Sequence, residues 1–128
     1  MALFRRKRDE PVDLDARSPD TGLKYKDLLV LGQLMKAGAD LTQPRHVLHF
    51  LYFPDQAVAF AASEEALQQG FTVDVREPLP QQPDQWSLVC EQHGVVLDPP
   101  TVVEHGDFFD GLAERHGGEY DGWEASVR

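Results

Sequence analysis

The run Arg45–Phe53, RHVLHFLYF, constrains the fold of this chain more than any other stretch. Alternate side chains of a strand point to opposite faces of its sheet. One set here is Val47, His49, Leu51 and Phe53, and the other is Leu48, Phe50 and Tyr52. Both sets are largely apolar, which is typical of a central strand and not of an edge strand. Both faces of this strand therefore have to be covered or used.

Helical and alternating apolar patterns predict three helices and four strands. The expected elements are a helix over 25–37, a strand over 45–53, a helix from Asp55 to about 69, a strand over 71–76, a strand over 86–92, a helix after Asp98, and a strand over about 119–127. Asp55 and Asp98 are each placed to cap a helix N-terminus. Gly38 is expected to end the first helix.

After the first helix the predicted order is β-α-β-β-α-β, which is the split βαβ arrangement. The sequence therefore predicts an α+β fold, a ferredoxin-like βαββαβ domain with an antiparallel four-stranded sheet and an extra N-terminal helix. Helices cover only one face of such a sheet. We expect the N-terminal helix or self-association to cover part of the second apolar face, with a partner as the remaining occupant.

The charge is unevenly distributed along the chain. The formal net charge is -10, yet four of the 12 basic residues fall in the cluster Arg5–Arg8, which leaves 8 basic against 22 acidic residues. The part of the chain outside this cluster is therefore strongly acidic, and it should repel phosphate backbones and attract basic protein segments. Residues 1–22 read as a disordered charged tail and 23–128 as the folded domain. Arg5–Arg8 could alternatively touch an anionic lipid surface or RNA.

The chain carries no apolar run of the ~20 residues that a membrane span needs, and its start lacks the apolar stretch of a signal peptide. These features predict a cytoplasmic protein with no membrane partner.

No catalytic, cofactor or metal site is predicted. Cys90 is expected to be a small core residue, since a lone cysteine cannot form an internal disulfide. His46 and His49 fall on opposite faces of their strand, so they cannot both coordinate the same metal ion. The remaining histidines are scattered along the chain, at positions 93, 105 and 116. No glycine-rich phosphate loop opens a helix.

Three stretches resemble the regulator of ribonuclease E activity B family. They are GADLTQPRHVLHFLYFPD, the pair Gly70-Phe71, and the ending GGEYDGWEASV. The resemblance covers about Tyr25 to the C-terminus, and the chain departs from it in its basic start and its short proline-rich middle loop. It implies a small, acidic, ferredoxin-like protein without enzymatic activity, which binds the scaffold region of ribonuclease E and reduces RNA degradation.

The candidate partner-binding residues are Tyr120, Asp121, Trp123, Glu124, His49 and Tyr52. Tyr and Trp serve as anchors in protein interfaces, and carboxylates pair with arginine-rich partners. A structural role is the alternative for EYDGWE, in which Gly122 permits a bulge and Trp123 packs over it.

The leading hypothesis is a non-enzymatic regulator whose protein partner is a ribonuclease E-like nuclease. A self-associating, ligand-sensing ferredoxin-like domain unrelated to RNA decay is the alternative, and a homo-oligomer in solution would favour it. Aromatic residues on an open sheet also fit RNA stacking, through Phe50, Tyr52 and Trp86. The acidic charge of the body and the missing basic-aromatic strand signature disfavour direct nucleic-acid binding.

Overall fold

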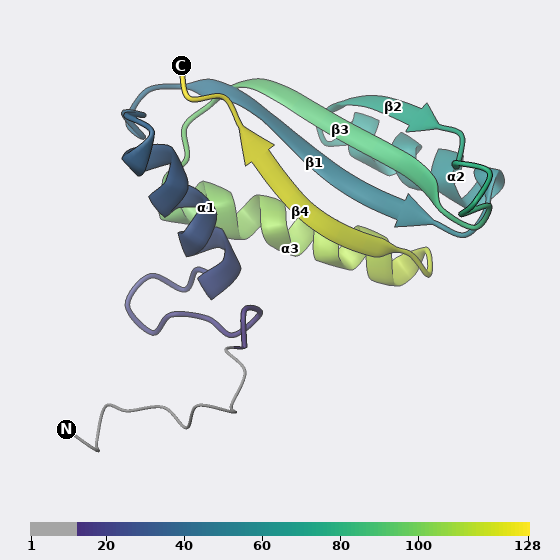
Figure 1. Cartoon of the computed structure of the whole chain (residues 1–128), viewed down its shortest axis with the longest axis horizontal. Coiled ribbons are helices and arrows are strands. Elements are labelled where there is room, and N and C mark those ends of the chain that lie inside the picture. Colours follow the sequence, from purple (N-terminus) through teal and green to yellow (C-terminus); the bar gives the residue numbers. More distant parts are fainter. Residues whose placement is uncertain (1–12) are drawn as a thin grey trace.

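A computed structural model of the chain describes residues 13–128, so the basic cluster of the predicted tail lies outside the described part. Three helices and four strands follow one another in the predicted order (Figure 1). They are α1 (Tyr25–Lys36), β1 (Arg45–Phe53), α2 (Gln56–Gln68), β2 (Thr72–Arg76), β3 (Trp86–Val95), α3 (Pro99–Arg115) and β4 (Glu119–Ala125).

The four strands form one antiparallel sheet in the order β2-β3-β1-β4. β1 is therefore central, as its two apolar faces predict. Helices α2 and α3 pack on one face, and Figure 1 shows both of them behind the strands, with α3 partly covered by β4. The predicted α+β, ferredoxin-like fold is confirmed.

The main core lies between the sheet and helices α2 and α3. The inward set of β1 is almost fully buried, with Leu51 and Phe53 at 0% and 1% exposure. Its partners in this core include Ala59, Ala62, Ala66, Phe71, Leu88, Cys90, Phe109 and Leu112. Small alanines on α2 let that helix approach the sheet closely, while the larger rings of α3 fill the space beside it.

Side chains cap α2 and α3 as predicted. The Asp55 carboxylate accepts a 2.9 Å hydrogen bond from the amide of Val58. The Asp98 carboxylate accepts one of 2.9 Å from the amide of Thr101. Each bond satisfies one of the amides that a helix N-terminus leaves without an intrahelical partner.

The expectation that the N-terminal helix covers the second face of the sheet is wrong. Helix α1 lies on the same side as α2 and α3, where Leu31 and Leu34 pack in a second cluster with Val47 and Val102. The cause is that α3 leaves the Val47 end of the inward face uncovered, and the leucine stripe of α1 fills that place. The opposite face keeps no covering element in the described structure.

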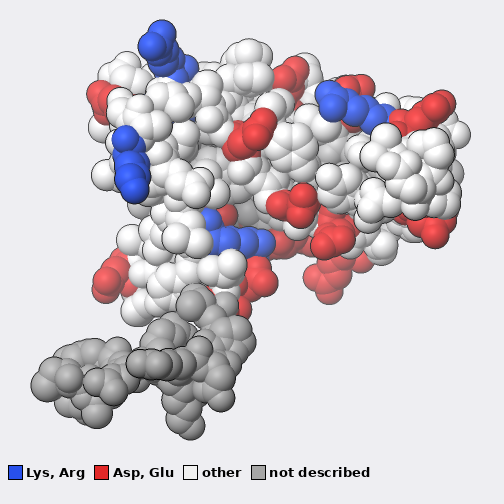
Figure 2. Space-filling model, viewed as in Figure 1, with Lys and Arg blue, Asp and Glu red and all other residues white. Residues whose placement is uncertain are grey.

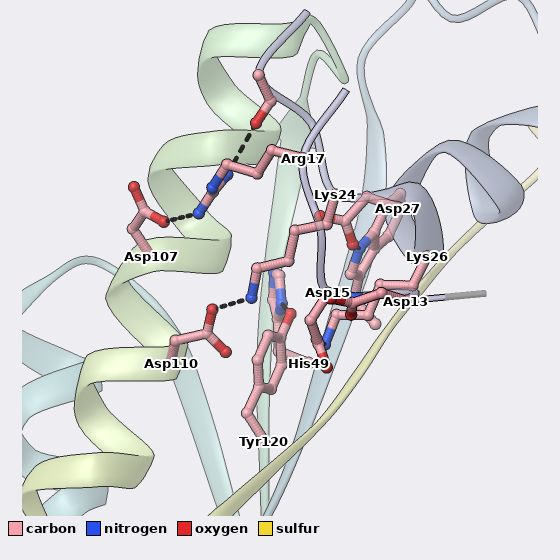
Figure 3. A network of polar contacts seen from close by, with 12 residues as sticks. Asp13, Asp15, Arg17, Lys24, Lys26, Asp27, His49, Asp107, Asp110 and Tyr120 are labelled. Atoms are coloured by element: carbon pink, nitrogen blue, oxygen red, sulfur yellow. Dashed lines mark hydrogen bonds and ion pairs between the residues drawn. The ribbon is translucent and has the colours of Figure 1, made fainter. Parts of the chain in front are cut away.

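Residues 13–24 form a short segment that leads into α1 and lies against α3 (Figure 3). Arg17 donates a 2.6 Å hydrogen bond to Asp107, and Lys24 forms an ion pair with Asp110. A main-chain bridge joins Arg17 and Lys24. The predicted domain boundary at residue 22 stays a prediction, and these contacts tie residues 17–24 to the folded domain.

Gly118, in the turn between α3 and β4, has no room for a side chain. A Cβ there would overlap the ring of Phe53 and the carbonyl oxygen of Tyr52. We expect Gly118→Ala to lower the free energy of unfolding by roughly 1–3 kcal/mol, measured by urea denaturation. Gly32→Ala is the matched control, because Gly32 lies in α1 with nothing near its Cβ position. It should raise stability by about 0.5–1 kcal/mol. An unchanged stability for Gly118→Ala would contradict the packing described here.

Candidate functional site

The uncovered face of the sheet carries an apolar strip along its two central strands. Leu48, Phe50 and Tyr52 of β1 project from it and are half-buried, and Val89 of β3 lies beside Phe50. A groove of about 270 Å³ runs along this strip. A second hollow of about 200 Å³ continues it toward Tyr52. We call this surface the open face.

Carboxylates border the strip. Asp74, Glu91 and Glu124 line the groove together with the apolar side chains, and Arg76 is the basic residue among its lining. Glu124 lies directly opposite Leu48 in the strand register, and Glu91 lies opposite Leu48 on the other side. The open face is thus an apolar strip with an acidic rim.

Most cations of residues 13–128 are already neutralised by neighbours. Of the 8 lysines and arginines in that range, five lie within 4.0 Å of a carboxylate, namely Arg17, Lys24, Lys26, Arg76 and Arg115. Arg45 is buried and donates hydrogen bonds to main-chain carbonyls. Figure 2 shows Asp and Glu side chains spread across the molecule among few Lys and Arg side chains. The surface therefore presents a net negative charge to a partner.

The structure divides the six predicted partner-binding residues between two sides of the sheet. Tyr52 and Glu124 lie on the open face. Asp121 is exposed on the edge strand β4, at a bulge that leaves it without a partner in β1.

The other three predicted residues, His49, Tyr120 and Trp123, point toward the helices. The bulge in β4 explains the placement of Tyr120 and Trp123, which an unbroken strand would put on opposite faces. Gly122, with φ of +107°, adopts the conformation that this bulge requires. The predicted structural role of Gly122 is thereby confirmed.

A polar cluster is enclosed beneath the sheet (Figure 3). His49 Nδ1 and the Tyr120 hydroxyl are joined by a 2.8 Å hydrogen bond. The indole N–H of Trp123 donates a 2.9 Å hydrogen bond to the buried carboxylate of Asp27, which fastens β4 to α1. These bonds orient β4, so the three inward residues support the open face from behind.

Burial controls the ionisation of this cluster. Burial, with a smaller contribution from the neighbouring His105, lowers the pKa of His49 to about 3. Burial also raises the pKa of Tyr120, as do the charges of Asp27 and Asp110. His49 is therefore a neutral imidazole at neutral pH, stacked on Phe109.

Cys90 is a core residue, as expected. It is fully buried, and burial raises the pKa of its thiol to about 12. A thiol in that state is protonated at neutral pH, so it lacks the thiolate that nucleophilic catalysis needs.

One group of side chains among residues 13–128 has the composition of a metal site. His46, Glu91 and His93 bring one ligand atom each to within 4.8 Å of one another. His93 is far from His46 in the sequence, but the fold brings the two together, and their rings stack. The sequence shows only the spacing Glu91-x-His93, which places these two residues on one face of a strand; the approach of His46 comes from the pairing of β1 with β3.

No helix among residues 13–128 is both long and apolar enough to cross a bilayer.

The fold and the uncovered acidic face define this chain as a small ferredoxin-like α+β protein. Residues 26–125 match the profile of the family Regulator of ribonuclease activity B, and the chain belongs to that family. The family is one of regulators of ribonuclease activity, in agreement with the resemblance noted from the sequence. No curated protein shows significant similarity to the chain.

The depressed pKa of His49 predicts a specific pH dependence of stability. Its folded-state pKa lies below the ordinary value of 6.5, so the unfolded chain binds a proton that the native state does not. The contribution of His49 to the free energy of unfolding is therefore constant above about pH 6.5. It decreases as the pH drops toward 3, by up to about 1.4 kcal/mol per pH unit.

Urea unfolding of His49→Gln at several pH values tests this prediction. The amide does not titrate, so the variant should show a shallower loss of stability between about pH 6 and 4 than the original protein. His93→Gln, which removes an exposed imidazole, is the control and should keep the full slope. Equal slopes for the original protein and His49→Gln would refute the buried, neutral state of His49.

Proposed function

We propose that this protein is a non-enzymatic regulator that binds ribonuclease E or a related nuclease and reduces its action on RNA. Membership in a family of ribonuclease regulators supports the class of target. The observation that carries the binding mode is the open face, where an apolar strip with an acidic rim lacks any covering element in the described structure.

The chemistry of the open face suits a basic, flexible polypeptide. Carboxylates such as Glu91 and Glu124 form charge-assisted hydrogen bonds with guanidinium groups. Phe50 and Tyr52 offer apolar area between them, on which the stems or planar heads of arginine side chains can pack. An arginine-rich arm of a nuclease meets both requirements. By occupying such an arm, the protein would compete with RNA for the same positive charges, and it would do so in the cytoplasm.

Direct RNA binding is disfavoured by the same surface. Stacking of bases on Phe50 and Tyr52 would bring phosphates against Glu91 and Glu124, while Asp74 and Arg76 of the same groove pair with each other. The paired state of most cations leaves few positive groups to offset that repulsion.

A second copy of the chain is the alternative occupant of the open face, as expected for a self-associating, ligand-sensing domain. The uncovered apolar strip favours it, whereas the acidic rim opposes it because two copies would bring like charges together. Sedimentation of the protein at low and high salt separates the two cases. A monomer that binds the arginine-rich segment supports the regulator, and a salt-stable dimer without such binding supports self-association.

Charge reversal on the open face tests the proposed binding mode. We expect Glu124→Lys to weaken binding of the arginine-rich scaffold segment of ribonuclease E roughly tenfold, because one attraction becomes a repulsion. Asp121→Lys should weaken it less, since Asp121 lies at the sheet edge. Fluorescence anisotropy of the labelled segment measures the affinity, and the melting temperature reports on folding.

Glu114→Lys is the matched control. Glu114 is exposed on α3, so this substitution makes the same change of charge on the helix side of the molecule. Its affinity should stay within about twofold of the original. An equal loss for Glu114→Lys and Glu124→Lys would mean that net charge alone governs binding. If Glu124→Lys lowers the melting temperature so far that unfolding explains its whole loss of affinity, the open face would also be rejected as the binding site.

A further inference from the structure

His46, Glu91 and His93 meet on the open-face side of the sheet because of how β1 and β3 pair. Arg45 is opposite Val95 and Val47 is opposite Gln92, so β3 carries one more residue than β1 over this interval. Gly94, with φ of +71°, lies within the resulting bulge. The irregularity sets His93 beside His46, while Glu91 projects on the same side two residues earlier.

The three side chains already interact. His46 Nε2 lies 2.7 Å from a carboxylate oxygen of Glu91. The imidazoles of His46 and His93 stack with their centroids 4.0 Å apart and their planes within 4° of parallel. One ligand atom from each of the three residues lies within 4.8 Å of the others. His93 is exposed and the other two are half-buried, so an ion can reach the group from solvent.

We propose that His46, Glu91 and His93 bind a divalent transition-metal ion, for which Zn²⁺ is the best match. Two imidazoles and one carboxylate form a ligand set used by zinc sites that keep a fourth position open. Mg²⁺ and Ca²⁺ prefer all-oxygen sites, so the two imidazoles select against them. The inference rests on the strand pairing and the ligand types, independently of the proposed function.

Binding requires a local rearrangement that the site can make. Tetrahedral zinc at about 2.0–2.1 Å from each ligand places neighbouring ligand atoms roughly 3.3 Å apart. The ligand atoms must therefore draw closer, and the two stacked rings must tilt toward a common point. Side-chain rotation of the exposed His93 and the half-buried His46 supplies this movement while the paired strands stay in place. The acidic charge of the surrounding protein favours a cation at this position.

Calorimetric titration of the full-length, tag-free and chelator-treated protein with Zn²⁺ tests the site. We expect saturable binding of one ion per chain. His93→Ala and Glu91→Gln should each weaken it at least tenfold, because each removes one of three protein ligands. His116→Gln is the control, since it removes an imidazole that lies beside Glu65 on the helix side, and it should bind as the original does.

Substitution with Co²⁺ gives an independent readout of geometry. The original protein should develop the strong visible d–d bands of low-coordinate cobalt with nitrogen ligands, and His93→Ala should not. Circular dichroism of each variant confirms that it is folded. The absence of saturable Zn²⁺ binding would overturn the proposal. Binding that survives His93→Ala and Glu91→Gln but is lost in His116→Gln would overturn it as well.

Discussion

The burial of β1 on its inward face is the interaction on which the rest of the structure depends. Val47, Leu51 and Phe53 are each at most 1% exposed, and they hold the sheet against all three helices. Fully burying side chains of this kind contributes roughly 1.5–3 kcal/mol each. Because β1 also pairs with β3 and β4, its register decides which residues of those strands face the helices. The alternate residues of β1 are then committed to the opposite face, where no element of the described structure covers them.

The polar cluster behind β1 connects this packing to the open face. His49 occupies an inward position between apolar neighbours, and its bond to Tyr120 fixes the bulged strand β4. Trp123 fastens the same strand to α1 through Asp27. These residues hold Glu124 in position on the far side of the sheet. A substitution in the enclosed cluster would therefore alter the open face indirectly, by shifting β4.

The sequence predicted the order and type of all seven elements, because their apolar periods and caps are local signals. Asp55 and Asp98 identify helix starts, and the double apolar pattern of β1 identifies the centre of the sheet. The placement of α1 was not predictable, since a leucine stripe shows that a helix is buried but not against which face. Its position depends on the space that α3 leaves near Val47, which is a tertiary property.

The candidate site was predicted only in part for a related reason. Tyr52 alternates regularly along β1 and reaches the open face. The directions of Tyr120, Trp123 and Glu124 depend instead on a bulge in β4, whose effect is set by its pairing with β1. The proximity of His46 and His93 likewise arises from a bulge in β3. Sequence spacing alone gives no register between strands, so neither arrangement could be read from it.

We propose that the open face, and not the helix side, receives a polypeptide partner. Amide chemical-shift mapping of the labelled protein, titrated with the arginine-rich scaffold segment of ribonuclease E, tests it most directly. We expect the largest shifts at Leu48, Phe50, Tyr52 and Glu124, with little change along the outer surfaces of α2 and α3. Shifts confined to those helices, with the open face unperturbed, would contradict it.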